Sequence, residues 1–302
     1  MTSILTNVAA MSALQTLRGI NSNLQDTQGR VSSGYRVAEA KDNAAYWSIA
    51  TTMRSDNKAL SAVSDALGLG AAKVDTAYSA LDSAIDIVTE IKAKIVAATE
   101  KGVDKAKIQD EIGQLQQQLL SVAQSASFSG ENWVAGNTTK SVVSSFVRDA
   151  NGEVSVKTTE YVLNDASSGN VLFGMTSVGG IDTETGIIGT SYASVGSIFE
   201  MDINTFSVDD INVALTTVES GLGALTKAAS QLGSISTRID LQESFVSNLS
   251  DSIDSGVGRL VDADMEEESS KLTALQTQQQ LAIQSLSIAN SSAQNVLTLF
   301  QN

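Results

Sequence analysis

Apolar residues recur at intervals of three and four along most of the chain, which is the spacing of one face of an α-helix. The longest run extends from Ile49 to Ile95, a second follows the capping residue Asp104, and a third begins after residues 208–209. We predict a long helix over each run, and such apolar seams favour packing as a coiled-coil-like bundle. The predicted core positions are Ile49, Met53, Leu60, Val63, Leu67, Val74, Tyr78, Leu81, Ile85, Val88 and Ile95 in the first helix, and Ile108, Ile112, Leu115, Leu119 and Val122 in the second.

The pattern changes between about residues 132 and 206. Ser141–Val147 and Glu153–Thr159 are rich in Val, Thr and Ser, and they flank a predicted hairpin turn at residues 149–152. A Gly-rich stretch farther on predicts short strands and loops. The expected fold is therefore mainly α: a long coiled-coil-like helical bundle formed by the N- and C-terminal halves, with a small β-rich inserted outer module.

Both ends of the chain carry a similar helical stripe, which predicts an amphipathic helix at each end. Glu268 and Gln279 interrupt the C-terminal stripe. The predicted assembly positions are Ile4, Val8, Met11, Leu14, Leu17, Ile20, Leu24 and Val31 in the N-terminal helix, and Leu272, Leu275, Ile283, Leu286, Val296, Leu297 and Phe300 in the C-terminal helix.

The two ends also avoid charge, since residues 1–17 and 272–302 contain no Asp, Glu, Lys or Arg. The conformational entropy lost on ordering either end exceeds what its few large apolar side chains return by burial. A stable terminal helix therefore needs partners on several sides, as in an interior built by many copies of the chain. The alternative is an ordinary antiparallel pair docked on its own domain. A helix lying on a membrane surface would have a polar face rich in Lys and Arg, and these helices do not.

The composition narrows the possible functions. The chain has 34 acidic and 19 basic residues, a formal net charge of -15, which disfavours binding to nucleic acid. It contains no Cys, His or Pro, so we expect no catalytic, metal or cofactor site, and we expect long uninterrupted helices. The acidic run from Asp262 to Glu267 lacks the Gly and Glu of a calcium loop and indicates either a solvated acidic face or a helix start.

The sequence also bears on membrane insertion and targeting. The first cation is Arg18, and no apolar run reaches 18 residues. We therefore expect neither a cleaved signal peptide nor a transmembrane helix.

Several motifs, in the same order along the chain, resemble those of bacterial flagellins. The segment IDIVTEIKAKIVAATE, residues 85–100, is similar to that of alphaproteobacterial, rhizobium-like flagellins. The N-terminal likeness lies in ALQTLRGINSNLQDTQGRVSSGYRVAEAKDNAA, residues 13–45. The C-terminal likeness lies in GRLVDADMEEESSKLTALQTQQQL, residues 258–281, and in QNVLTLF, residues 294–300. The motif residues are Ser32, Ser33, Gly34, Arg36, Asp42, Arg259, Asp262, Asp264, Gln294 and Asn295.

The resemblance implies a structural subunit, not an enzyme, that self-assembles into the flagellar filament used for swimming. Residues 1–45 and 255–302 would be inner-core helices lining the filament channel, residues 46–134 and 205–254 an outer-core helical bundle, and residues 135–204 a surface-exposed β-rich insert. The chain would leave the cell unfolded through the flagellar type III pathway and reside in the extracellular filament. Its partners would be other flagellin copies and the export chaperone, cap and hook-junction proteins. The alternatives are a hook-filament junction protein and a surface adhesin acting through the insert.

Overall fold

The computed structural model describes residues 7–100, 102–149, 151–176, 179–192 and 195–299, and for residues 292–299 it describes the helix but not the side chains. The chain divides into two compact units, residues 1–58 with 251–302, and residues 59–250. Two helices of 54 residues, α2 (Ala44–Ala97) and α5 (Val208–Val261), have parts in both units. The fold is a helical bundle with a small β-rich module, as the sequence predicts.

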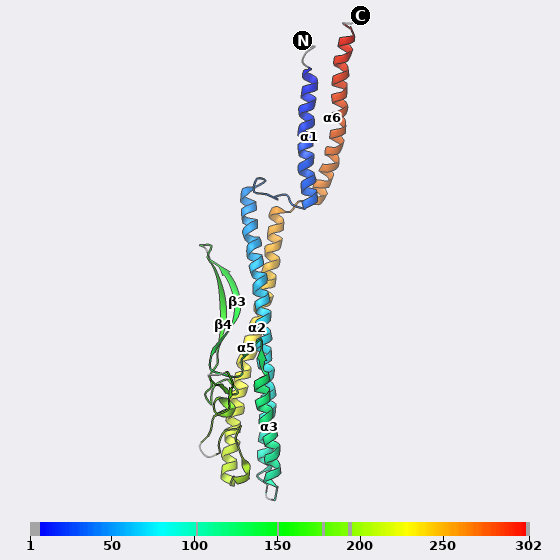
Figure 1. Cartoon of the computed structure of the whole chain (residues 1–302). Coiled ribbons are helices and arrows are strands. Elements are labelled where there is room, and N and C mark those ends of the chain that lie inside the picture. The colour runs from blue at the N-terminus through cyan, green and yellow to red at the C-terminus, as the bar shows by residue number, and fades with distance from the viewer. Residues whose placement is uncertain (1–6, 101, 150, 177–178, 193–194, 300–302) are drawn as a thin grey trace. The chain divides into compact units, whose positions relative to one another are not determined.

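The first unit contains the two terminal helices. α1 (Val8–Ser33) and α6 (Met265–Leu299) pack side by side and run in opposite directions (Figure 1). Both predicted terminal helices are thus confirmed over the described residues. Next to them, Val37 of the loop after α1 packs with Ala50 at the start of α2 and with Val257 and Val261 at the end of α5. Met53, Ile253 and Leu260 pack against this small core.

The second unit is built on the remaining parts of α2 and α5 and on α3 (Lys105–Ser125). Asp104 caps α3 as predicted, since its side chain accepts a hydrogen bond from the backbone N of Ala106 at 3.1 Å. Salt bridges join α2 to both partners, from Lys92 to Glu219 on α5 and from Lys94 to Glu111 on α3. The buried stripe of α2 contains most of the predicted core positions, namely Leu60, Val63, Leu67, Val74, Leu81, Val88 and Ile95.

Six predicted core positions are not buried: Ile49 and Tyr78 are exposed, and Met53, Ile85, Leu115 and Val122 are only half-buried. Ile49 and Tyr78 lie on the same face of α2 as the buried Leu67 and Leu60, so the helical period alone does not predict their exposure. On α3, the buried positions beside Leu115 and Val122 are Gln116 and Ala123, and the Gln116 amide is satisfied by the carbonyl oxygens of residues 198 and 201, each at 3.1 Å.

Over the described residues, three two-stranded antiparallel sheets follow α3, two of them inside the insert and one, β1 with β2, just before it. The longest is the predicted hairpin, β3 (Thr139–Arg148) with β4 (Val154–Val162), and the Asp149 side chain holds its turn by accepting from the backbone N of residues 151 and 153. The other elements are short: β1 (Ser127–Phe128), β2 (Glu131–Asn132), β5 (Gly174–Met175), β6 (Ile181–Asp182), the helix α4 (Gly186–Gly189) and the 3-10 helix η1 (Ile203–Thr205).

Two helical glycines let the insert approach the bundle closely. A Cβ built on Gly70 of α2 would lie 2.1 Å from a methyl group of Val142 on β3. A Cβ built on Gly221 of α5 would lie 2.6 Å from Cδ1 of Ile198. The insert also has its own core, where Trp133 stacks on Tyr161 with ring centroids 6.1 Å apart.

Candidate assembly surface of the terminal helices

The end of α1 and the start of α6 are joined through their short connecting segments. Gly34 follows α1 with a φ of +75°, the left-handed conformation in which a Cβ is costly. Its carbonyl oxygen accepts from the backbone N of Ala263 at 2.8 Å. The backbone N atoms of Arg36 and Val37 both donate to the carbonyl oxygen of Val261, at 2.7 and 3.1 Å. The segment entering α2 is therefore bonded to the segment leaving α5.

Two charged motif residues complete the helix ends at this junction. The Arg36 guanidinium donates to the carbonyl oxygens of Leu260, at 3.1 Å, and Arg259, at 3.4 Å. These carbonyls have no partner inside α5, and a cation interacts favourably with a helix C-terminus. Asp264 caps α6, accepting from the backbone N of Glu266 at 3.0 Å. This confirms the helix start, one of the two interpretations of the acidic run.

Asp42 stabilises the loop between α1 and α2. Its carboxylate accepts from the backbone N of Ala38 and of Glu39, each at 3.1 Å. The hydrogen bond from Glu39 is the main cause that lowers the pKa of the Asp42 carboxyl below its usual value.

The other motif residues lie near the same junction or outside the described side chains. Ser32 and Ser33 end α1, and the Ser33 hydroxyl accepts from the backbone N of Tyr35 at 3.2 Å. Asp262 forms an isolated backbone bridge with Tyr35, and Arg259 is in the last turn of α5. Gln294 and Asn295 belong to α6, and their side chains lie outside the described part of the structure.

The seam between α1 and α6 contains polar pairs that the sequence did not reveal. The sequence predicts that Glu268 and Gln279 interrupt the C-terminal stripe. In the structure both residues lie within the seam instead. Gln279 Nε2 donates to Asn21 Oδ1 at 2.7 Å, and Arg30 Nη1 lies 3.2 Å from Glu268 Oε1. The apolar stripe gave no signal for these pairs, because neither Asn21 nor Arg30 is one of its positions.

The predicted assembly positions divide into seam residues and exposed residues. Leu275 is buried in the seam, and Leu17, Ile20, Leu24, Val31, Leu272 and Leu286 are half-buried. Val8, Met11, Leu14 and Ile283 are exposed, with 69% of Val8 and 56% of Met11 accessible. Ile4 and Phe300 lie outside the described residues, and Val296 and Leu297 lie in α6 beyond the described side chains.

Sequence reasoning missed other exposed apolar side chains of this unit. Leu281 and Ile288 of α6 are exposed, by 59% and 69%, and both lie off the three-four stripe used for prediction. Tyr46 and Trp47 are exposed in the first turn of α2. The pair α1 and α6 therefore leaves uncharged apolar side chains on the solvent side of both helices.

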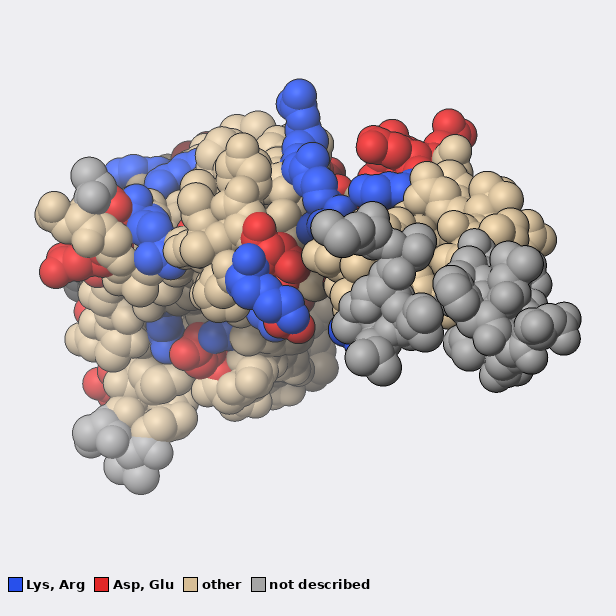
Figure 2. Space-filling view, turned by 90° about the horizontal axis from the view of Figure 1, so that it is seen from above, with Lys and Arg blue, Asp and Glu red and all other residues tan. Residues whose placement is uncertain are grey.

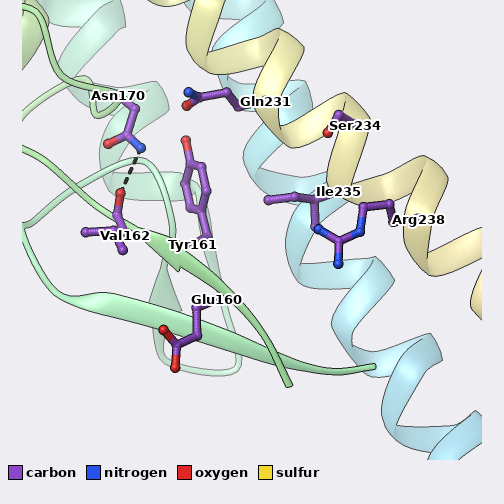
Figure 3. Close-up of a pocket in the computed structure, with 8 residues that line it drawn as sticks. All are labelled: Glu160, Tyr161, Val162, Asn170, Gln231, Ser234, Ile235 and Arg238. Atoms are coloured by element: carbon purple, nitrogen blue, oxygen red, sulfur yellow. Dashed lines mark hydrogen bonds between the residues drawn. The ribbon is translucent and has the colours of Figure 1, made fainter. Parts of the chain in front are cut away.

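The second unit contains an open groove of about 340 Å³ between the insert and α5. Figure 3 shows the Tyr161 ring standing between the loop that carries Asn170 and the helix that carries Gln231 and Arg238. The Tyr161 hydroxyl is buried without a well-formed hydrogen bond, because the Asn170 amide donates to the carbonyl oxygen of Val162 at 2.9 Å. Burial raises the pKa of Tyr161 to about 12, and the Asn170 carboxamide offsets part of this effect.

The charged side chains of the described residues form no cluster that could hold a metal ion. Figure 2 shows acidic and basic side chains in small groups among uncharged residues on the face seen from above. Over the part of the chain that the structure describes, no helix is both long and apolar enough to cross a membrane.

Comparison with known proteins gives a consistent result at both ends of the chain. Residues 4–139 match the family described as bacterial flagellin N-terminal helical region, and residues 215–300 match the bacterial flagellin C-terminal helical region. Flagellin C of Rhizobium meliloti (strain 1021) is 56% identical over 320 aligned residues, and flagellin A of the same strain is 50% identical over 399. Flagellin of Brucella melitensis biotype 1 is 46% identical over 309. In each comparison the alignment covers 100% of both chains.

The helical fold with a small β-rich module, together with these matches at both ends of the chain, defines a structural protein that assembles with copies of itself. The chain belongs to the bacterial flagellin family. It is a structural subunit of the flagellar filament, the extracellular helical polymer of swimming bacteria. The alternatives, a junction protein and an adhesin, are not favoured.

Proposed function

We propose that the subunit polymerises through the apolar side chains that α1 and α6 leave exposed. In this proposal residues 1–45 and 255–302 line the channel of the filament, residues 46–134 and 205–254 form the surrounding helical bundle, and residues 135–204 face outward. The supporting observation is the exposure of Val8, Met11, Ile283 and Ile288 in the uncharged parts of the two helices, residues 8–17 of α1 and 272–299 of α6. Contacts with neighbouring copies would remove these side chains from water.

The remaining partners and the export route follow from family membership alone. We propose that the chain is exported unfolded by the flagellar type III pathway, without a cleaved signal peptide. The export chaperone, the filament cap and the hook-junction proteins are its proposed partners. The long helices, unbroken by proline, suit a chain that refolds after export, because no X-Pro isomerisation delays folding. The chain acts as a structural element and carries out no catalysis.

A single charged substitution tests the assembly surface. Ile288→Asp places a carboxylate where the proposal buries an apolar side chain, so growth from filament seeds should be lost. The melting of the soluble chain should stay within about 0.5 kcal/mol of wild type, because Ile288 is exposed.

Ser155→Asp is the matched control. It adds the same charge at an exposed position of β4, in the proposed outward insert, and should polymerise normally. The proposal is wrong if Ile288→Asp grows filaments at the rate of Ser155→Asp.

A further inference from the structure

The seam between α1 and α6 is linked by polar contacts at three levels along its length. Asn7 Nδ2 donates to the carbonyl oxygen of Ala289 at 2.9 Å, and Gln279 Nε2 donates to Asn21 Oδ1 at 2.7 Å. Arg30 Nη1 lies 3.2 Å from Glu268 Oε1. The order of the partners on α6 is the reverse of that on α1, so all three contacts belong to one antiparallel register.

The apolar part of the seam does not select that register. Its half-buried or buried members recur at steps of three, four and seven, and many are alanines: Ala10, Ala13, Leu17, Ile20 and Leu24 on α1, and Leu272, Leu275, Ala282, Leu286 and Ala289 on α6. Sliding α6 by seven residues, about 10 Å, would again place apolar positions against apolar positions. The alanines interlock weakly with the facing helix, so steric complementarity does not prevent the shift.

The polar contacts would not survive such a slip. Glu268 is buried, and its Oε2 has no hydrogen-bond partner in the described part of the chain, so its carboxylate depends on Arg30. A slipped seam would leave that charge buried without its cation, and the Asn21 and Gln279 amides without each other. Single polar pairs fix register in this way in coiled coils.

We propose that Asn21 with Gln279 and Arg30 with Glu268 select the register of the terminal helix pair, and thereby the surface offered to neighbouring copies. Because Asn7 contacts Ala289, Val8 and Met11 lie at the level of the segment that contains Ile288. A seven-residue slip would separate these exposed apolar residues and divide the surface. The consequence for assembly rests on the proposed function, whereas the register itself does not.

The chain contains no Cys, so introduced cysteine pairs report the register without background. Ala10→Cys with Ala289→Cys reports the observed register, and Ala10→Cys with Ala282→Cys reports a seven-residue slip. A short bismaleimide is added, and intramolecular crosslinks are scored on denaturing gels for the full chain, both in polymer and in concentrated soluble form. In the wild-type background the first pair should crosslink and the second should not.

The test background removes the polar pairs through Asn21→Leu, Gln279→Leu, Arg30→Leu and Glu268→Leu. The ratio of observed to slipped crosslink should fall at least about tenfold, since each lost pair is worth about 1 kcal/mol of selectivity. The exchange Arg30→Glu with Glu268→Arg keeps the ion pair and should keep the wild-type ratio. Leu substitutions at Lys41 and Glu39, an exposed pair at 2.8 Å outside the seam, should also keep it.

The two readouts separate the two proposals. The crosslink ratio measures the register, and the yield of polymer from seeds measures the assembly surface. An unchanged ratio in the four-leucine background would overturn the register proposal, whatever the yield. A lowered ratio with full yield would support register selection and contradict its consequence for assembly.

Discussion

Arg30 and Glu268, 238 positions apart in the sequence, form a salt bridge across the seam of α1 and α6 with an N to O distance of 3.2 Å. The Glu268 side chain is only 9% exposed, whereas that of Arg30 is 37% exposed. The carboxylate therefore depends on its partner more than the guanidinium does, since water reaches the latter.

Arg30→Leu should therefore be more harmful than removal of both charges. The single change leaves a buried carboxylate without its cation and should cost about 1–3 kcal/mol. Arg30→Leu with Glu268→Leu should recover most of this loss. The measurement is the temperature at which the polymer dissociates. Lys41→Leu, which breaks an exposed salt bridge, is the control and should shift it little. Equal losses for the single and double variants would show that the ion pair itself stabilises the seam.

The close approach of the insert to the bundle predicts opposite effects for neighbouring glycines. Gly70→Ala places a Cβ against the branched Val142 side chain and should destabilise the chain by about 1–3 kcal/mol despite the higher helix propensity of Ala. Gly221→Ala meets Cδ1 at the flexible end of Ile198 and should destabilise it by less. Gly68→Ala and Gly223→Ala meet no atom within 4 Å and should stabilise it by about 0.5–1 kcal/mol. Urea unfolding of the soluble chain measures all four. Stabilisation by Gly70→Ala or Gly221→Ala would contradict the close contacts.

Tyr161→Phe should leave the free energy of unfolding unchanged or raise it by up to about 1 kcal/mol, because it removes a buried hydroxyl that lacks a hydrogen bond. Thermal melting of the soluble chain is the measurement. Tyr78→Phe serves as the control, since its ring is already exposed, and should be neutral. A clear loss in Tyr161→Phe alone would mean that the hydroxyl has a partner in solution.

The raised pKa of Tyr161 also predicts a loss of stability at high pH. The phenol has a pKa of about 12 in the folded chain against 10.0 ordinarily, so the unfolded chain releases its proton first. The stability due to the neutral phenol is fully present below pH 10, and falls by about 1.4 kcal/mol for each pH unit up to about pH 12. Urea unfolding at pH 9, 10 and 11 should show a shallower decline in Tyr161→Phe than in wild type. If the free energy of unfolding declined equally with pH in both proteins, Tyr161 would not have a raised pKa in the folded chain.

The features predicted correctly from sequence depend on local physical chemistry. Asp104 caps a helix, and Asp149 and Gly152 fit a tight turn, because these side chains bond to the backbone within a few residues. The long helices follow from a repeat of apolar positions that holds over many turns. None of these predictions requires knowledge of how distant segments meet.

The wrong predictions all depend on contacts between segments that are far apart in the sequence. The prediction that Gln279 interrupts its stripe fails because the side chain has a partner, Asn21, at the other end of the chain. Gly70 lowers the helix propensity of α2, yet the approach of Val142 requires a residue without a side chain there. Gln116 is buried because carbonyl oxygens of the insert satisfy its amide. Periodicity cannot supply such long-range partners, and it also misses exposed residues such as Ile288, whose role depends on other molecules.

The central claim is that neighbouring copies stabilise the terminal helices. Hydrogen exchange of the α1 and α6 amides in the dilute soluble chain, compared with the polymer, tests it most directly. The account predicts rapid exchange at residues 8–33 and 265–299 in the soluble chain and strong protection of the same residues in the polymer, with α3 protected in both. Strong protection of α1 and α6 in the dilute chain would contradict it.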